Sequence, residues 1–249
     1  MNVTGKIKLN YTQEFRIACK INNLKHEELL QYFVNHVSFY AFIGGDMRAI
    51  NLWATTVCIE CKDKLGGTIK AVSNPGLKEI SLKYIRGLTA LSVENGLSKH
   101  LEAGKSIVLM KEWADEMLPL TDYPASIYID EEKVLNLTFD FNLLCRMNGF
   151  ESESLLQYFI DNISLARERA VNLFQMVKTD PSTAVLLMMA NSSEIKNKIL
   201  PQQDLYRKYG LLLLELDQQQ KEESNLIKRI NSYSVFYQEW FKAMNKNIN

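Results

Sequence analysis

Two cysteines separated by two residues form the first pair whose types and spacing could do chemistry. Cys58 and Cys61 make a CxxC pattern, which zinc centres and redox disulfides both use. A structural zinc site needs four ligands, and the sequence contains no second CxxC. The pair also lies in a helical pattern with Trp53 and Val57. We therefore interpret both cysteines as core residues, with a metal site as the alternative.

Side chains for acid–base or nucleophilic catalysis are scarce. The chain has three histidines, His26, His36 and His100. It contains no glycine-rich phosphate loop, no dinucleotide-binding glycine string, no GxSxG elbow and no HExxH zinc motif. We therefore expect neither an enzyme nor a bound cofactor.

Composition narrows the class of protein. The 249 residues are 47% hydrophobic and 23% charged, which is typical of a folded globular chain. Lys and Arg number 29, as do Asp and Glu, and this balance excludes a strongly basic nucleic-acid coat. The apolar run at 184–190 is far shorter than the roughly 20 residues that span a bilayer. With four cysteines and no signal-like N-terminus, we expect a cytoplasmic protein without a membrane partner.

A repeated segment is the strongest pattern in the sequence. Residues 9–38 and 135–164 align without a gap at an offset of 126, and 13 of the 30 positions are identical. The block LLQYF occurs in both copies. Such agreement indicates an internal duplication.

A second pattern recurs in the remainder of each copy. The spacing Val-x-x-x-Glu-Trp-x-x-x-Met begins at Val108 and again at Val235. We therefore predict two repeat units, 1–124 and 125–249, joined at the proline-flanked segment 119–124.

Each repeat unit is predicted to open with a strand and two helices. Alternating or β-favouring residues predict strands at 6–11, 126–129 and 133–139. Two short amphipathic helices follow in each copy, and a stop signal separates them, Asn22-Asn23 in one copy and Asn148-Gly149 in the other. The strand–helix–turn–helix units therefore span 6–38 and 126–164.

The tails of both units, 46–118 and 165–246, are helical in pattern. The predicted helices of these tails cover 50–61, 77–94, 97–117, 165–178 and 201–244, the last broken near Ser232. A loop is predicted at 66–76. The expected fold is mainly α with minor β, an internal duplication in a pseudo-twofold arrangement.

A strand followed by two helices with an Asn or Gly turn resembles the ribbon-helix-helix family of DNA-binding proteins. The segment 141–160 also resembles a helix-turn-helix, with Cys145 at the small early position and Gly149 at the turn. In the ribbon-helix-helix family, two strands pair into an antiparallel ribbon that enters the major groove. The resemblance covers the 30 residues of each repeat and implies that two copies in one chain act as a covalent pseudo-dimer.

The resemblance also implies which side chains would face DNA. They are Lys6, Lys8 and Asn10 from one strand, with Lys133 and Asn136 from the other. Lysine neutralises phosphate charge, and asparagine can read an adenine edge. Only the asparagines occupy equivalent positions in the two copies. Ordinary solvent-facing strand residues are the alternative interpretation.

Two aromatic clusters, at 32–42 and 233–241, fit either a partner-binding groove or packing at the seam between two helical units, which their spacing favours. The leading hypothesis is a non-enzymatic, bacterial, DNA-associated or regulatory protein that uses its duplicated units as a platform for double-stranded DNA. The alternative is a helical adaptor or structural subunit that binds another protein through an aromatic helical surface. The oligomeric state stays open.

Overall fold

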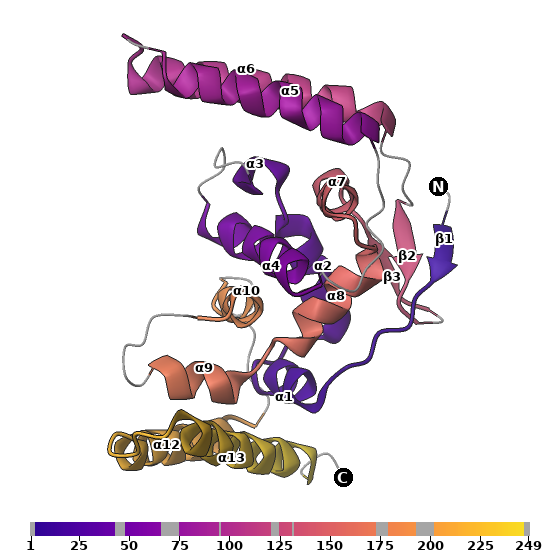
Figure 1. Cartoon of the computed structure of the whole chain (residues 1–249). Coiled ribbons are helices and arrows are strands. Elements are labelled where there is room, and N and C mark those ends of the chain that lie inside the picture. The colour runs from indigo at the N-terminus through magenta and orange to yellow at the C-terminus, as the bar shows by residue number, and fades with distance from the viewer. Residues whose placement is uncertain are drawn as a thin grey trace. The chain divides into compact units, whose positions relative to one another are not determined.

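The computed structural model of the chain is mainly helical, with one small β-sheet (Figure 1). The prediction of a mainly α fold with minor β is confirmed. The structure describes residues 3–42, 48–65, 75–94, 96–120, 125–130, 132–172, 179–192 and 202–246. These residues form two compact units. Unit 1 comprises Met1–Leu9 and Phe33–Leu156, and unit 2 comprises Asn10–Tyr32 and Gln157–Asn249.

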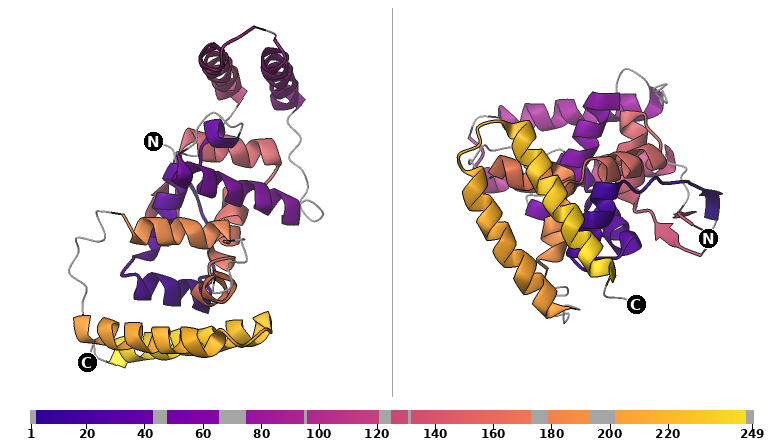
Figure 2. Two further views of the ribbon diagram at one scale, coloured as in Figure 1. Left: turned by 90° about the vertical axis from the view of Figure 1, so that its left-hand side faces the viewer. Right: turned by 90° about the horizontal axis from the view of Figure 1, so that it is seen from below.

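Unit 1 contains the sheet and a helical hairpin. Its elements are β1 (Val3–Lys6), α3 (Phe39–Phe42), α4 (Ala49–Leu65), α5 (Pro75–Ser92), α6 (Lys99–Met117), a 3₁₀ turn (Leu118–Leu120), β2 (Ser126–Tyr128), β3 (Val134–Asn136) and α7 (Phe139–Asn148). Helices α5 and α6 lie side by side (Figure 2). Trp113 of α6 packs edge-on against Phe39, with 4.9 Å between ring centroids, and stacks on Tyr84 at 6.0 Å. These rings attach the hairpin to α3.

The sheet has the order β1-β2-β3. Strand β1 pairs parallel to β2, and β2 pairs antiparallel to β3, with Ser126 opposite Asn136 and Tyr128 opposite Val134. The two strands that precede the repeated helices, β1 and β3, are therefore separated by β2.

The predicted strand at 6–11 has the wrong bounds. Pairing with β2 starts at Val3 and ends at Ile7, whose N–H donates to the carbonyl of Tyr128 at 3.0 Å. Beyond Ile7 the side chains still alternate between more and less exposed as far as Tyr11. The alternation of polar and apolar residues predicts which side chains are exposed. A β-strand also needs backbone hydrogen bonds to a neighbouring strand, which this alternation does not predict.

Unit 2 is built from helices. Its elements are α1 (Gln13–Ile21), α9 (Leu165–Asn172), α10 (Pro181–Ala190), α12 (Gln203–Gln220) and α13 (Leu226–Lys246). Helix α13 packs along α9 and also contacts α1 and α12. Trp240 of α13 stacks on Tyr209 of α12 at 5.4 Å. Two further helices, α2 (His26–His36) and α8 (Ser152–Asp161), contribute to both units.

The first helix of each repeat starts with the same cap. The hydroxyls of Thr12 and Thr138 each accept from the backbone N–H three residues later, at 3.2 Å. Threonine at the N-cap satisfies a backbone donor that has no partner inside the helix.

The same two helices also end alike, as predicted. The amides of Asn22 and Asn148 each donate to the carbonyl four residues earlier, at 2.8 Å. The next residues, Asn23 and Gly149, have φ angles of 53° and 73°. This left-handed conformation ends a helix and is adopted most easily by glycine and asparagine.

Each unit combines the first helix of one repeat copy with the tail of the other. In unit 1, α7 packs against α3 and α4, and Asp140 accepts from the N–H of Phe39 at 2.9 Å. In unit 2, α1 packs against α13, and Glu14 accepts from the hydroxyl of Ser164 at 3.1 Å. The compact units therefore cut across the sequence halves 1–124 and 125–249.

The tail helices follow the sequence pattern with two corrections, the first being that α10 (Pro181–Ala190) was not among the predicted helices. Helices α4, α5 and α6 match the predicted ones, but the break expected near Ser232 lies between α12 and α13. Ser232 is inside α13, where its hydroxyl donates to the carbonyl of Lys228 at 3.0 Å. The break forms at Asn225, whose side-chain oxygen accepts from the N–H groups of Ile227 and Lys228. The predicted loop 66–76, the joint 119–124 and the end of the predicted helix 165–178 lie largely outside the described residues.

Candidate functional site

The lysines predicted to face DNA lie near the sheet of unit 1. Lys6 and Lys8 are exposed, and so is Lys133, which follows the turn between β2 and β3. The ammonium of Lys133 lies 3.8 Å from the carboxylate of Asp130. The N–H groups of Glu132 and Lys133 donate to this carboxylate, and together with the Lys133 and Lys6 charges they lower the pKa of Asp130. The Asp130 carboxylate is thus favoured in its ionised form by these N–H groups and by the charges of Lys133 and Lys6.

The two predicted asparagines have different surroundings. Asn10 belongs to unit 2, where its backbone N–H donates to the side chain of Gln157 at 2.8 Å and its carbonyl accepts from the same amide at 2.9 Å. Asn136 is exposed on β3, and the buried Leu135 precedes it. Successive strand residues point to opposite faces, so Asn136 shares the exposed face of β3 with Val134.

The cysteines are core residues in the described part of the chain. Cys58, Cys61 and Cys145 are all buried, the first two on α4 and the third on α7. Burial raises the pKa of Cys61 to about 12 and that of Cys58 further above its usual range. Metal binding and nucleophilic attack both use the thiolate. Among the described residues, no three His, Cys, Asp or Glu side chains gather as a metal site requires.

The predicted aromatic clusters supply packing rather than surface. Phe33, Phe39, Tyr233, Tyr237 and Trp240 are all buried. The interpretation as packing between helices is the one that the burial supports, and only the partly buried Phe236 of the second cluster also lines a groove in the described part of the chain.

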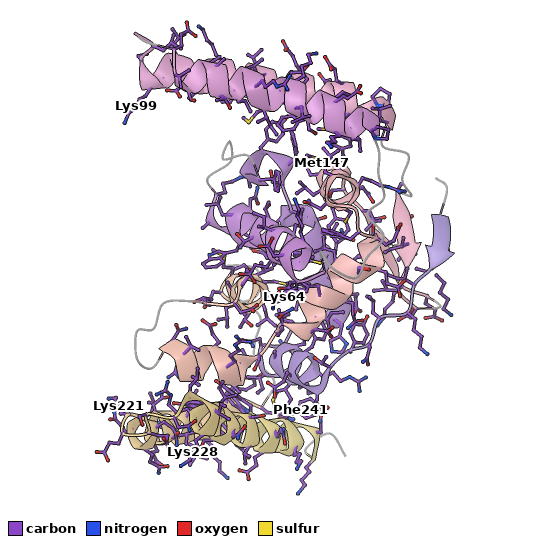
Figure 3. The ribbon with its side chains drawn as sticks, in the orientation of Figure 1. Lys64, Lys99, Met147, Lys221, Lys228 and Phe241 are labelled. Atoms are coloured by element: carbon purple, nitrogen blue, oxygen red, sulfur yellow. The ribbon has the colours of Figure 1, made fainter. Side chains whose placement is uncertain are left out.

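Exposed aliphatic residues instead gather on the two helical hairpins, α5–α6 and α12–α13. On α5–α6 they are Leu82, Ile85, Leu101, Ile107 and Val108, and on α12–α13 they are Leu211, Leu212, Leu214, Ile227 and Val235. Lysines extend outward near the two turns, Lys99 in one hairpin and Lys221 and Lys228 in the other (Figure 3). Each hairpin is thus apolar on its core side and also on part of its outer side.

The recurring Val-x-x-x-Glu-Trp-x-x-x-Met pattern has members on the core side and on the outer side of each hairpin. Its Trp and Met members, Trp113 and Met117 in α6, are buried, as are their counterparts in α13. Its valines are exposed to nearly the same extent, 54% for Val108 and 56% for Val235. The sequence identified these valines as part of the recurring pattern but did not predict their exposure, because apolar residues at helical spacing usually face the core. The available signal was a second apolar stripe on the same helices.

A groove runs between α12 and α13 in unit 2. It has a volume of about 490 Å³ and is lined by Lys208, Leu212 and Glu215 from α12 and by Val235, Phe236 and Glu239 from α13. Both signs of charge flank its apolar floor, which is typical of the edge of a protein contact.

A polar cluster on the core side holds this second hairpin in place. Asp217 of α12 accepts from Arg169 Nε of α9 at 3.0 Å and from the hydroxyl of Tyr233 of α13 at 2.9 Å. A second guanidinium nitrogen completes a bidentate pair with the same carboxylate. The pair raises the pKa of Arg169, and burial with the Asp217 bond raises that of Tyr233. These bonds fix α12 against α9 and α13 with its leucines outward.

Comparison with protein-family models, with curated proteins and with solved structures finds no match for this chain. In the part of the chain that the structure describes, no helix combines the length and the apolar character that crossing a bilayer requires. The side chains of this chain are therefore the evidence for its function.

Proposed function

We propose that this chain is a helical adaptor that binds protein through the aliphatic outer faces of its hairpins, α5–α6 and α12–α13. The observation that carries the proposal is the equal exposure of Val108 and Val235, at 54% and 56%. Clustered exposed apolar side chains, unlike single ones, are a feature of interaction surfaces.

The recurring pattern supports this proposal because it has two separable parts. Packing explains the Trp and Met positions, which are buried in both copies. Packing does not explain the valine and the glutamate four residues later, Val108 with Glu112 and Val235 with Glu239, since all four are exposed. One helical turn separates each pair, so an apolar contact and a carboxylate recur together on both outer faces.

A photo-crosslinking amino acid placed at positions 108 and 235 in the full chain tests the proposal in the native host. Crosslinks from both positions to a protein that then binds the purified chain would support it, provided that Val108→Asp and Val235→Asp weaken that binding. Lys62 and Lys25 are exposed control positions, one in each unit. Crosslinks that are equally frequent from the controls, or none from either valine, would contradict it.

The same proposal includes the predicted duplication with its pseudo-twofold pairing. Matched bonds in the two units support it. In unit 1 the hydroxyl of Thr55 accepts from Ser38 N–H at 3.0 Å, and in unit 2 that of Thr183 accepts from Ser164 N–H at 3.1 Å. Ser38 and Ser164 are equivalent repeat positions that precede α3 and α9. Asp140 and Glu14 are also matched, since each lies on the first helix of one repeat unit and accepts a hydrogen bond from the other.

DNA contact is the second candidate function, favoured by the exposure of Lys6 and Lys8 at alternate positions of one extended segment. Fluorescence anisotropy with a mixed-sequence duplex, at about 50 and about 200 mM salt, tests it because phosphate contacts weaken steeply with salt. Binding that is lost in Lys6→Ala/Lys8→Ala would support DNA contact. Absence of binding at the lower salt would remove this candidate and leave the adaptor proposal intact.

A further inference from the structure

Helix α12 has an exposed stripe on the side that its own unit leaves open. Arg207, Leu211, Leu214 and Gln218 follow one another at intervals of four, three and four residues, and all are exposed. This is the spacing of the seam of a coiled coil. Leu211 and Leu214 form its centre, and each is 58% exposed.

The side of α12 opposite the stripe is already occupied. Asp217 faces α9 and α13 through its bonds to Arg169 and Tyr233, and Tyr209 stacks on Trp240. At 100° per residue, Leu211 and Leu214 point away from these contacts. A partner at the stripe would therefore add to the packing of unit 2 without displacing it.

The charges beside the stripe indicate what the partner is. Lys208 and Glu215 flank the two leucines on the same edge, and both are exposed. Seven residues along a helix correspond to about 10.5 Å, which is too far for an ion pair within α12. The stripe thus offers one cation and one anion, placed almost symmetrically about its apolar centre.

We infer that two copies of this chain associate through α12, with the two helices antiparallel about a twofold axis between Leu211 and Leu214. In this arrangement Leu211 packs against the second copy's Leu214, and Lys208 faces its Glu215. Each contact occurs twice, as twofold symmetry requires. A parallel pair would bring Glu215 toward Gly210 instead and would leave both charges without an opposite charge.

The inference rests on the proposed function in one respect, because it names a second copy as the partner of one hairpin surface. It uses different residues from the valine pair on α6 and α13. The contact is small, with two leucines from each copy at its centre, so we expect a dimer that dissociates on dilution.

Sedimentation velocity of the full chain between about 1 and about 100 μM tests the inference. The expected result is a reversible monomer–dimer equilibrium that Leu211→Asn/Leu214→Asn shifts to monomer. Leu101→Asn/Ile107→Asn, on the exposed side of α6, is the matched control and should leave the equilibrium unchanged. Circular dichroism must show that each variant keeps its helical content.

Charge reversal provides the sharper test. Lys208→Glu alone and Glu215→Lys alone should each be monomeric, since each brings like charges together twice. An equimolar mixture of the two should form a heterodimer, and Lys208→Glu/Glu215→Lys in one chain should restore the homodimer. A wild-type chain that stays monomeric at about 100 μM, or a dimer that is indifferent to these reversals, would overturn the inference.

The two proposals fail separately. A monomeric wild-type chain whose positions 108 and 235 crosslink to a different protein contradicts self-association and leaves the adaptor function standing. A charge-dependent dimer whose positions 108 and 235 crosslink to no other protein contradicts the adaptor function and leaves self-association standing.

Discussion

Replacing Asp217 with alanine should lower the free energy of unfolding of unit 2 by about 2–4 kcal/mol. Tyr233 is fully buried and donates to Asp217, so its hydroxyl would lose that acceptor, at a cost of about 1–3 kcal/mol. The side chain of Arg169 is 41% exposed. Water can solvate the guanidinium when its partner is removed, so the lost ion pair contributes only about 1 kcal/mol.

The measurement is urea unfolding, followed by the fluorescence of Trp240 in a background where Trp53 and Trp113 are phenylalanine. Both replaced tryptophans belong to unit 1, so the remaining signal reports on unit 2. Asp217→Asn keeps an acceptor for Tyr233 and should therefore be milder, at about 1–2 kcal/mol. The matched control is Lys228→Ala, which removes an exposed pair with Glu223 at 3.9 Å and should not move the midpoint.

Two outcomes would refute this reasoning. If Asp217→Ala unfolds within about 0.5 kcal/mol of its parent, the cluster does not hold the hairpin in place. If the alanine and asparagine variants are equally unstable, the loss of charge dominates, and the buried hydroxyl of Tyr233 is not the main source of the cost.

Four further outcomes follow from the described contacts. Cys19 and Cys61, whose pKa values burial raises to about 12, should resist iodoacetamide at pH 8, where about one thiol in 10⁴ is ionised; mass spectrometry that finds both modified in the folded chain would contradict this. Thr183→Val should cost about 0.5–1.5 kcal/mol in urea unfolding, since two partly buried backbone groups lose their hydroxyl partner; an unchanged midpoint would argue against the bond. Burial raises the pKa of Tyr237 to about 12, above its unfolded value of about 10, so this contribution to stability is complete below pH 10 and is lost as pH rises through 12; Tyr237→Phe should flatten the alkaline loss in thermal melts. Cleavage at a protease site inserted within 121–124 should leave both fragments in one gel-filtration peak, because each unit contains helices from both fragments; separation without denaturant would show otherwise.

Local structure was the part of the fold that the sequence predicted well. The stops at Asn22-Asn23 and Asn148-Gly149 depend on residues that themselves adopt or stabilise the left-handed conformation, so no distant contact is needed. Ser232 was misread because a serine hydroxyl can bond to a carbonyl inside a helix as readily as it can interrupt one.

The exchange of first helices lies beyond what the sequence can predict. Because α1 and α7 lie at equivalent positions of two similar segments, 13 of whose 30 positions are identical, either could pack against its own tail or the other tail with the same apolar face. Only the contacts distinguish these arrangements, such as Glu14 beside Ser164. The order of the strands is hidden as well, since the residue pattern does not show that β2 is the strand that pairs with both others.

The exposed leucine stripe of α12 could not be predicted for a different reason. Leu211 and Leu214 belong to a run of apolar residues that covers more than one side of α12. Periodicity assigns such residues to the core. It cannot show which side finds a partner within the chain, because that depends on where α9 and α13 pack.

The pairing of helices from distant parts of the sequence also determines when unit 2 can fold during synthesis. Helices α1 and α13 pack together in unit 2 although they come from opposite ends of the chain. At about 5–20 residues per second, a ribosome needs about 10–40 s to extend the chain from one to the other. During this interval α1, whose Phe15 and Ile17 are buried in the finished structure, lacks its native neighbour α13. The nascent N-terminal segment should therefore bind chaperones that recognise short apolar stretches, and folding of unit 2 should follow synthesis of α13.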